Sequence, residues 1–256
     1  MTLVDRTVLV TAASSGIGLA TATRLRKAGA AVFIAGRDEQ RTRAAAETVG
    51  ASGWIARDLA IRDSAREIAD AAAETLGRVD ILVSNTGGPR PGDFLGTAME
   101  EWDHAYGLIL RSALQLTHTV LPEMLNAGWG RLIYLTSSGV TSPLPGLHLS
   151  NVLRAGVENL ARSLVPEVGP RGVTTHVVAP AHVDTDRYRS IMRGRADAFG
   201  EDYQEFLARH RDNLPLRRLG ASDDVAALVE FLCSDDGSYL TGQRYLVDGG
   251  TTGTAT

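Results

Sequence analysis

The chain has 256 residues, of which 44% are hydrophobic and 22% charged, and its formal net charge is −4 at pH 7. The length suits one α/β domain over residues 1–256, and the acidic balance gives no electrostatic footprint for nucleic acid. Cys233, the one cysteine, excludes an internal disulfide framework and is expected in the core of a cytoplasmic protein. Met1–Asp5 has no leader layout and no apolar run approaches ~18 residues, so we expect no membrane association.

The first structural signal is a strand, a turn of small residues and a helix. The run 7–10 is apolar, rich in β-branched residues and not alternating, which indicates a strand buried on both faces. Thr11–Gly18 forms the turn, where Gly16 and Gly18 let backbone N–H groups approach a phosphate at a helix N-terminus. This arrangement is typical of a nucleotide-binding βαβ unit; a glycine-rich turn without a ligand is the alternative. No lysine follows the glycines, so an ATP or GTP phosphate loop is excluded.

Strand and helix patterns alternate along the rest of the chain. Further strands are predicted at Ala31–Ala35, Gly53–Ala56, Val79–Ser84, Leu132–Leu135, Thr174–Val178 and Arg244–Val247. Helices are predicted at 38–49, 64–76 and 97–126, from about 149 to 167, and from 222 onward. Capping boxes are expected at Ser64 with Glu67 and at Thr97 with Glu100. Seven strands separated by helices predict a single Rossmann-type doubly wound seven-stranded parallel sheet with helices on both faces.

The longest irregular stretch covers about residues 181–219 and is rich in Arg, Asp and Glu. A long insertion after a late strand usually covers the carboxyl ends of the strands, where such sheets bind ligands, so we expect a lid. A merely solvated loop is the alternative.

Six stretches, in order, resemble the motifs of the short-chain dehydrogenase/reductase family. They are Thr11–Gly18 with Ala12 at the family's first glycine, Asp58-Leu59, Ser84–Gly87, Arg131–Ser137, Ala179–Thr185 and Gly242–Gly250. The resemblance spans nearly the full length and is strongest to β-ketoacyl-acyl-carrier-protein reductases. It implies NADP or NAD as cofactor, a small-molecule carbonyl substrate, and a homotetramer or dimer formed through the helices at 97–126 and 149–167.

The resemblance also implies which residues hold the cofactor. They are Thr11, Ala13, Ser14, Ser15, Gly16, Ile17, Gly18, Arg37, Asp58, Leu59, Asn85, Thr86, Gly87, Pro180 and Thr185. Gly36 occupies the position where an acid would bind the ribose 2′-hydroxyl of NAD, and Arg37 follows it, which favours NADP(H). Asp38 argues the other way and leaves NAD as the alternative.

The family's catalytic Ser, Tyr, Lys and Asn correspond here to Ser137, Ser150, Arg154 and Ile109. Arginine stays charged but relays no proton, and an aliphatic alcohol is a far weaker acid than a phenol. The proton donor of a reductase is therefore missing from its usual place. We take Ser137, Ser150, Arg154 and His148 as candidate catalytic residues, and Tyr188, His182 and Tyr106 as further candidate donors, with Tyr106 expected mainly to pack in the core. No metal-ligand spacing is recognisable.

The sequence therefore predicts reduction of a 3-oxoacyl-like carbonyl with NADPH at a non-standard active site. One alternative is a catalytically silent sensor or scaffold that binds NADP(H). Another is a lyase or isomerase on the same fold that uses Arg154 and His148. The four arginines at 187, 189, 193 and 195 fit either an anionic substrate or a solvated surface.

Overall fold

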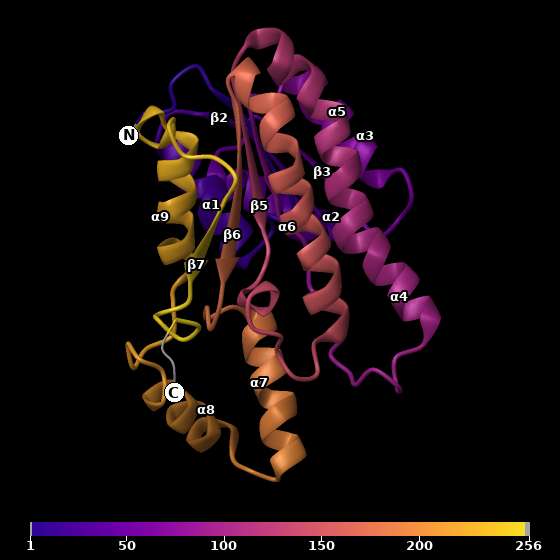
Figure 1. Cartoon of the computed structure of the whole chain (residues 1–256), viewed down its shortest axis with the longest axis vertical. Helices are drawn as coiled ribbons and strands as arrows, with labels where there is room; N and C mark the ends of the chain where they lie inside the picture. The colour runs from indigo at the N-terminus through magenta and orange to yellow at the C-terminus, as the bar shows by residue number, and fades with distance from the viewer. Residues whose placement is uncertain (1, 254–256) are drawn as a thin grey trace.

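The computed structural model describes residues 2–253 and contains a seven-stranded parallel sheet (Figure 1). The strands are β1 (Thr7–Val10), β2 (Ala31–Gly36), β3 (Gly53–Ala56), β4 (Ile81–Ser84), β5 (Gly130–Leu135), β6 (Val173–Pro180) and β7 (Gln243–Val247). The α-helices are α1 (Gly16–Lys27), α2 (Glu39–Val49), α3 (Ser64–Leu76), α4 (Met99–Tyr106), α5 (Ser112–Ala127), α6 (His148–Val168), α7 (Asp186–Phe199), α8 (Tyr203–Asp212) and α9 (Ser222–Cys233). Shorter helical segments are η1 (Gly107–Arg111), η2 (Ser138–Val140), η3 (Gly169–Arg171) and η4 (Asp235–Gly237).

The strand order is β3-β2-β1-β4-β5-β6-β7, and each neighbouring pair is parallel, which confirms the predicted doubly wound sheet. Strands of a parallel sheet are covered on both faces, and β1 shows how its sequence meets that demand. Val8 and Val10 face one hydrophobic core, whereas Leu9 faces the other. Helices α3, α5 and α6 contribute to Leu9's core, and α1, α2 and α9 contribute to the opposite one.

Cys233 lies fully buried in the second core, as the sequence predicts. Burial raises the pKa of its thiol to about 12, because the thiolate would lose its hydration there. The residue therefore fills space and has no thiolate character near neutral pH.

The N-cap residue is wrong in two of the predicted helices. Helix α3 begins at Ser64, but its N-cap is Asp63, so Ser64 is already helical and buried. Helix α4 begins after Ala98, where the Glu101 carboxylate accepts from the Ala98 N–H at 3.2 Å. The Thr97 hydroxyl instead donates to the Asp93 carbonyl. The helix predicted at 97–126 is also interrupted, since the π-helical turn η1 separates α4 from α5.

The stretch 181–219, expected to be an irregular lid, is largely helical; we keep the name lid for it, and its role as a lid stays a prediction. The stretch folds into α7 and α8, which extend beyond the carboxyl ends of the strands (Figure 1). Thr185 caps α7 and Asp202 caps α8 through side-chain hydrogen bonds to backbone N–H groups. The two helices share a small core of their own around Met192 and Phe206.

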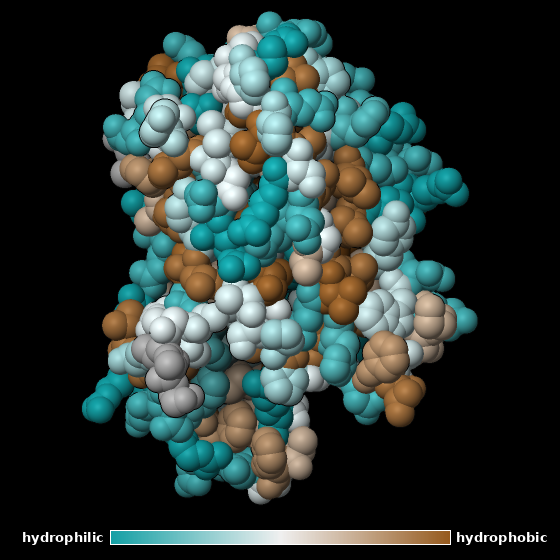
Figure 2. Space-filling model, viewed as in Figure 1, coloured by the Kyte–Doolittle hydropathy of each residue, from teal (hydrophilic) through white to brown (hydrophobic). Residues whose placement is uncertain are grey.

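Hydrophobic side chains show on the outer side of the α5 and α6 layer in the same view (Figure 2). Leu114 on α5 is 40% exposed and Val152 on α6 is 57% exposed. Within residues 2–253, no helix combines the length and the apolar character needed to cross a membrane.

Candidate active site

Hydrogen bonds to β2 and to the residue after β4 hold the turn that follows β1. The Thr11 hydroxyl donates to the Asn85 carbonyl at 2.6 Å and accepts from the Asn85 N–H at 3.0 Å. The Ala13 N–H donates to the Ala35 carbonyl at 2.9 Å. A Cβ at Gly18 would overlap the Ala12 carbonyl, so glycine is needed for the close packing of the turn. Among the predicted cofactor residues, Thr11, Ala13 and Gly18 are buried and shape the turn without lining an open space.

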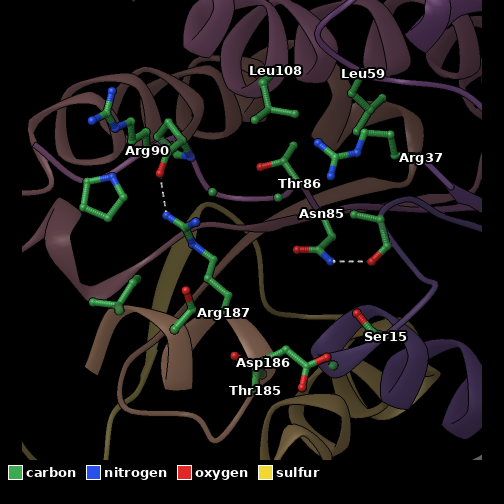
Figure 3. Close-up of a pocket in the computed structure, with 18 of the residues that line it drawn as sticks. Ser15, Arg37, Leu59, Asn85, Thr86, Arg90, Leu108, Thr185, Asp186 and Arg187 are labelled. Carbon is green, nitrogen blue, oxygen red and sulfur yellow. Dashed lines mark hydrogen bonds between the residues drawn. The ribbon is translucent and has the colours of Figure 1, made fainter. Parts of the chain in front are cut away.

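A cleft of about 1130 Å³ opens in front of this turn, at the carboxyl ends of the strands (Figure 3). The structure brings most of the predicted cofactor residues to its lining: Ser14, Ser15, Gly16, Ile17, Arg37, Asp58, Leu59, Asn85, Thr86, Gly87 and Thr185. The Ser15 side chain makes no capping hydrogen bond at the start of α1, which leaves its hydroxyl and the first helical N–H groups available to an anion. The cleft therefore has the donors and the shape for a phosphate-bearing ligand.

One end of the cleft carries positive charge. Arg37, Arg41 and Arg57 line it, and Arg37 makes no ion pair with any carboxylate among the described residues. A Cβ at Gly36 would overlap the Thr42 hydroxyl, and glycine leaves no side chain where an acid would bind the ribose. The Asp38 carboxylate accepts from the Arg41 N–H at 2.8 Å as the N-cap of α2. Asp38, the acid that argued for NAD, therefore has a structural role as a helix cap.

A smaller cavity of about 230 Å³ adjoins the cleft, and we call it the inner cavity. Its lining includes Ser137, Ser150 and Arg154 from the predicted catalytic set, together with Pro180 and Thr185 from the predicted cofactor set. The carboxyl ends of β4, β5 and β6, the start of α6 and the lid helix α7 form its walls.

Arg154 holds these walls together. Its guanidinium donates to the Leu135 carbonyl at 2.9 Å, the Thr86 hydroxyl at 3.2 Å and the Gly87 carbonyl at 3.3 Å. Burial, and secondarily the nearby charge of Arg187, lower the pKa of Arg154 to about 10, so it remains a cation at neutral pH. Arg154 therefore ties α6 to the ends of β4 and β5.

Both serines of the inner cavity have an acceptor site occupied by the protein. The Arg154 Nε–H donates to Ser150 Oγ at 3.2 Å, and the Gly139 N–H donates to Ser137 Oγ at 3.2 Å. Each hydroxyl proton stays available to donate into the cavity. Two such donors can stabilise negative charge that develops on a carbonyl oxygen.

The lid brings three ionisable side chains together at the inner cavity. The Tyr188 hydroxyl lies 3.5 Å from His182 Nδ1, and His210 Nε2 lies 3.2 Å from the same nitrogen. Burial lowers the pKa of His182 to about 4 and raises that of Tyr188 to about 12. Tyr188 and His182 line the cavity. Near neutral pH the cluster therefore holds a protonated phenol beside a neutral imidazole.

Three of the predicted donors or catalytic positions lie elsewhere. His148 is the first residue of α6, packs edge-on against the Phe94 ring and lines neither the cleft nor the inner cavity, so its position gives its catalytic assignment no support. Ile109 is buried in the core beneath η1, which leaves no polar group there for a water relay. Tyr106 is 42% exposed, and the Arg111 guanidinium lies 5.9 Å from its ring centroid. The expectation that Tyr106 packs in the core is therefore wrong.

His210 was missed by the sequence analysis, because it lies 28 residues from His182 on a helix that the composition did not reveal. The described residues contain no cluster of three or more His, Cys, Asp or Glu side chains arranged for a metal ion.

The fold and the position of the cleft define a Rossmann-type α/β protein, and comparisons with known proteins narrow that class. A family model described as enoyl-(acyl carrier protein) reductase matches residues 11–252. Dehydrogenase/reductase SDR family member 4 of Homo sapiens is 32% identical over 97% of this chain and 88% of that protein. The 3-oxoacyl-acyl-carrier-protein reductase of Aquifex aeolicus is 30% identical, covering 94% of this chain and 95% of that one.

Solved structures agree with these sequence matches. An actinorhodin polyketide ketoreductase variant with NADPH superposes with a TM-score of 0.93 at 28% identity, covering 99% of this chain and 100% of that one. L-sorbose reductase from Gluconobacter frateurii, complexed with NADPH and L-sorbose, gives 0.91 at 26% identity and covers 100% and 99%. The chain belongs to the short-chain dehydrogenase/reductase family.

Proposed function

We propose that this protein is an NADPH-dependent reductase of a carbonyl compound, with a 3-oxoacyl-like compound as the expected substrate type. The observation that carries the proposal is the continuity of the arginine-ended cleft with a cavity holding two hydroxyl donors and a phenol. The NADPH complexes of the ketoreductase and of L-sorbose reductase support it, as does the 3-oxoacyl reductase among the relatives.

The cofactor fits the residues of the cleft. The start of α1 at Ser15–Ile17 would hold the pyrophosphate, Arg37 would pair with the 2′-phosphate, and Asp58 and Leu59 would lie beside the adenine. Gly36 has no side chain, which leaves that wall of the cleft bare for close approach of the cofactor. When bound, NADPH supplies the hydride of the reaction.

The chain's own residues would supply orientation and the proton. Ser137 and Ser150 donate hydrogen bonds to the substrate carbonyl oxygen, and Tyr188 gives that oxygen its proton. With this proton on the oxygen and the hydride that NADPH would supply to the carbon, the carbonyl π bond would break and the product would be an alcohol. His182 and the half-buried His210 then return a proton from solvent to the Tyr188 oxygen.

Burial leaves this proton transfer favourable. The Tyr188 hydroxyl, with its pKa raised to about 12 by burial, is still protonated at neutral pH. It remains a stronger acid than the aliphatic alcohol that the reaction forms. His182 is neutral at that pH, because burial lowers its pKa to about 4. A neutral imidazole can share a hydrogen bond with the Tyr188 hydroxyl.

Turnover of the reduced nicotinamide with a panel of β-keto esters, quinones and diketones tests the function. Tyr188→Phe should lower kcat by ~10²–10⁴-fold, the usual contribution of a positioned acid. Tyr203→Phe is the matched control, since Tyr203 belongs to the same lid but lines neither space. Equal activity of Tyr188→Phe and wild type would refute the assignment of the donor.

A rescue experiment separates a missing acid from a damaged scaffold. In the Tyr188→Phe background, Ser150→Tyr together with Arg154→Lys rebuilds the family's usual pair on a residue that lines the inner cavity. Turnover should recover, whereas Ser150→Phe with Arg154→Lys should leave it low.

A silent NADP(H)-binding sensor is the second candidate, favoured by the engagement of Arg154 with protein acceptors in place of the family's lysine. NADPH binding without turnover of any carbonyl would establish it. The lyase or isomerase alternative needs His148 beside Arg154, and the position of His148 outside the cavity gives it no support.

A further inference from the structure

The four arginines of α7 fall into two pairs with different surroundings. Arg189 pairs with Asp184 at 2.7 Å, and the Arg193 guanidinium lies over the Tyr203 ring at 5.0 Å. Arg187 and Arg195 instead line both the cleft and the inner cavity. The solvated-surface interpretation therefore fits only the first pair.

The side-chain hydrogen bonds of Arg187 and Arg195 go to backbone carbonyls. Arg187 Nη2 donates to the Pro89 carbonyl at 2.7 Å, as Figure 3 shows, and Arg195 Nη2 donates to the Pro145 carbonyl at 3.4 Å. Neither makes an ion pair with a carboxylate in residues 2–253. A Cβ at Gly88 would overlap the Arg187 guanidinium, so glycine there lets the cation lie against the loop after β4.

The fully charged side chains that line the inner cavity are cations. Arg154, Arg187 and Arg195 are among its lining residues, and no described lining residue is Asp or Glu. A carboxylate would give these guanidinium groups bidentate hydrogen bonds between opposite charges, which a neutral carbonyl cannot provide. Arg154 already has its contacts to α6, β4 and β5, which leaves the two lid arginines as the free cations.

We propose that the substrate is a keto acid, whose carboxylate is held by Arg187 and Arg195 while its ketone lies at Ser137 and Ser150. The volume of about 230 Å³ restricts it to a small molecule. The ketone half of this inference rests on the proposed function, but recognition of the carboxylate is a binding property that stands without turnover.

Calorimetric titration of matched pairs tests the recognition directly. The probes are acetoacetate against acetoacetamide and benzoylacetate against benzoylacetamide, each with and without saturating NADP⁺. Members of a pair differ in charge but scarcely in shape. We expect the carboxylate of at least one pair to bind ten-fold or more tightly than its amide. Equal affinities in both pairs, or no binding of any probe, would overturn the inference.

Variants assign the effect to residues. Arg187→Gln and Arg195→Gln should each reduce the preference for carboxylate at least five-fold, whereas Arg193→Gln, on the same helix but paired with Tyr203, should preserve it. An anionic group of the cofactor is the other possible partner of Arg187. If Arg187→Gln weakens NADPH binding and retains the full carboxylate preference, the assignment of Arg187 to the substrate is overturned. Failure of the wild-type protein to bind NADPH would instead refute the proposed function. The titrations without cofactor would still decide whether the cavity recognises a carboxylate.

Discussion

Ala12 holds its backbone in the left-handed region, with φ at 46°, at the position where the family has its first glycine. A residue with a Cβ is strained there, and replacement by glycine relieves a cost of ~1–2 kcal/mol while adding ~0.5–1 kcal/mol of unfolded-state entropy. We therefore expect Ala12→Gly to raise the free energy of unfolding, by about 0.5–1 kcal/mol in urea denaturation. Ala13→Gly is the control, because buried Ala13 has no such strain and should lose stability. Equal destabilisation by both changes would show that the turn is not strained.

Individual site residues were predictable where a motif fixed their register. Counting from the family's motifs placed Ser137, Ser150 and Arg154 correctly in one cavity. His148 was misplaced because its direction depends on how the preceding loop turns into α6, and no local pattern reports that. His210 carried no motif at all, since only the packing of α8 brings it to His182.

The loop between η2 and α6 is held to its helix by one side chain. Asn151 donates to the Leu144 carbonyl at 2.9 Å and accepts from the Leu144 N–H at 3.3 Å. Leu144 and Leu147 line the inner cavity but Asn151 does not. Asn151→Ala should therefore cost about 1–2 kcal/mol of stability and raise KM for the carbonyl substrate.

Asn159→Ala on the outer face of α6 is the matched control, because its one exposed hydrogen bond to Ala155 is expected to contribute little. Urea denaturation and steady-state kinetics measure both effects. An unchanged KM in a destabilised Asn151→Ala would contradict the assignment of this loop to the substrate cavity.

At the scale of elements, the sequence predicted all seven strands, because buried parallel strands leave unambiguous apolar runs. It did not reveal α7 and α8, because they bury few side chains and their sequences are dominated by polar and charged residues. It also missed the break between α4 and α5, since a π-helical turn continues the same helical pattern with one different hydrogen bond.

The stability of the whole molecule should depend on pH through its buried histidines. Burial lowers the pKa of His176 and of His182 to about 4, against an ordinary value of about 6.5. Between these pH values the unfolded chain binds protons that the folded chain does not, so stability falls as pH drops from about 6.5 to about 4. Each group contributes up to ~1.4 kcal/mol per pH unit to this slope.

Urea unfolding at a series of pH values tests this linkage. His176→Gln removes a fully buried titratable ring and should flatten the slope, whereas His118→Gln, at an exposed position, should leave it unchanged. An unaltered slope in His176→Gln would show that its proton affinity does not change on folding.

The outer faces of α5 and α6 remain the predicted contact between subunits of a homotetramer or dimer. Light scattering in solution measures that state, and a monomer would refute it. Helices α5 and α6 run along one face of the sheet, whereas α7 and α8 lie beyond the carboxyl ends of the strands (Figure 1). Assembly and cofactor binding are therefore expected to use different surfaces.

The central claim is that the cleft holds NADP(H) with its 2′-phosphate on Arg37. Equilibrium titration with NADPH and NADH, on wild type and on Arg37→Gln, measures it most directly. NADPH should bind at least ten-fold more tightly to wild type, and Arg37→Gln should weaken NADPH about 10–100-fold while changing NADH little, because only NADPH carries that phosphate. Equal or reversed affinities for the two dinucleotides, or binding of neither, would contradict the account.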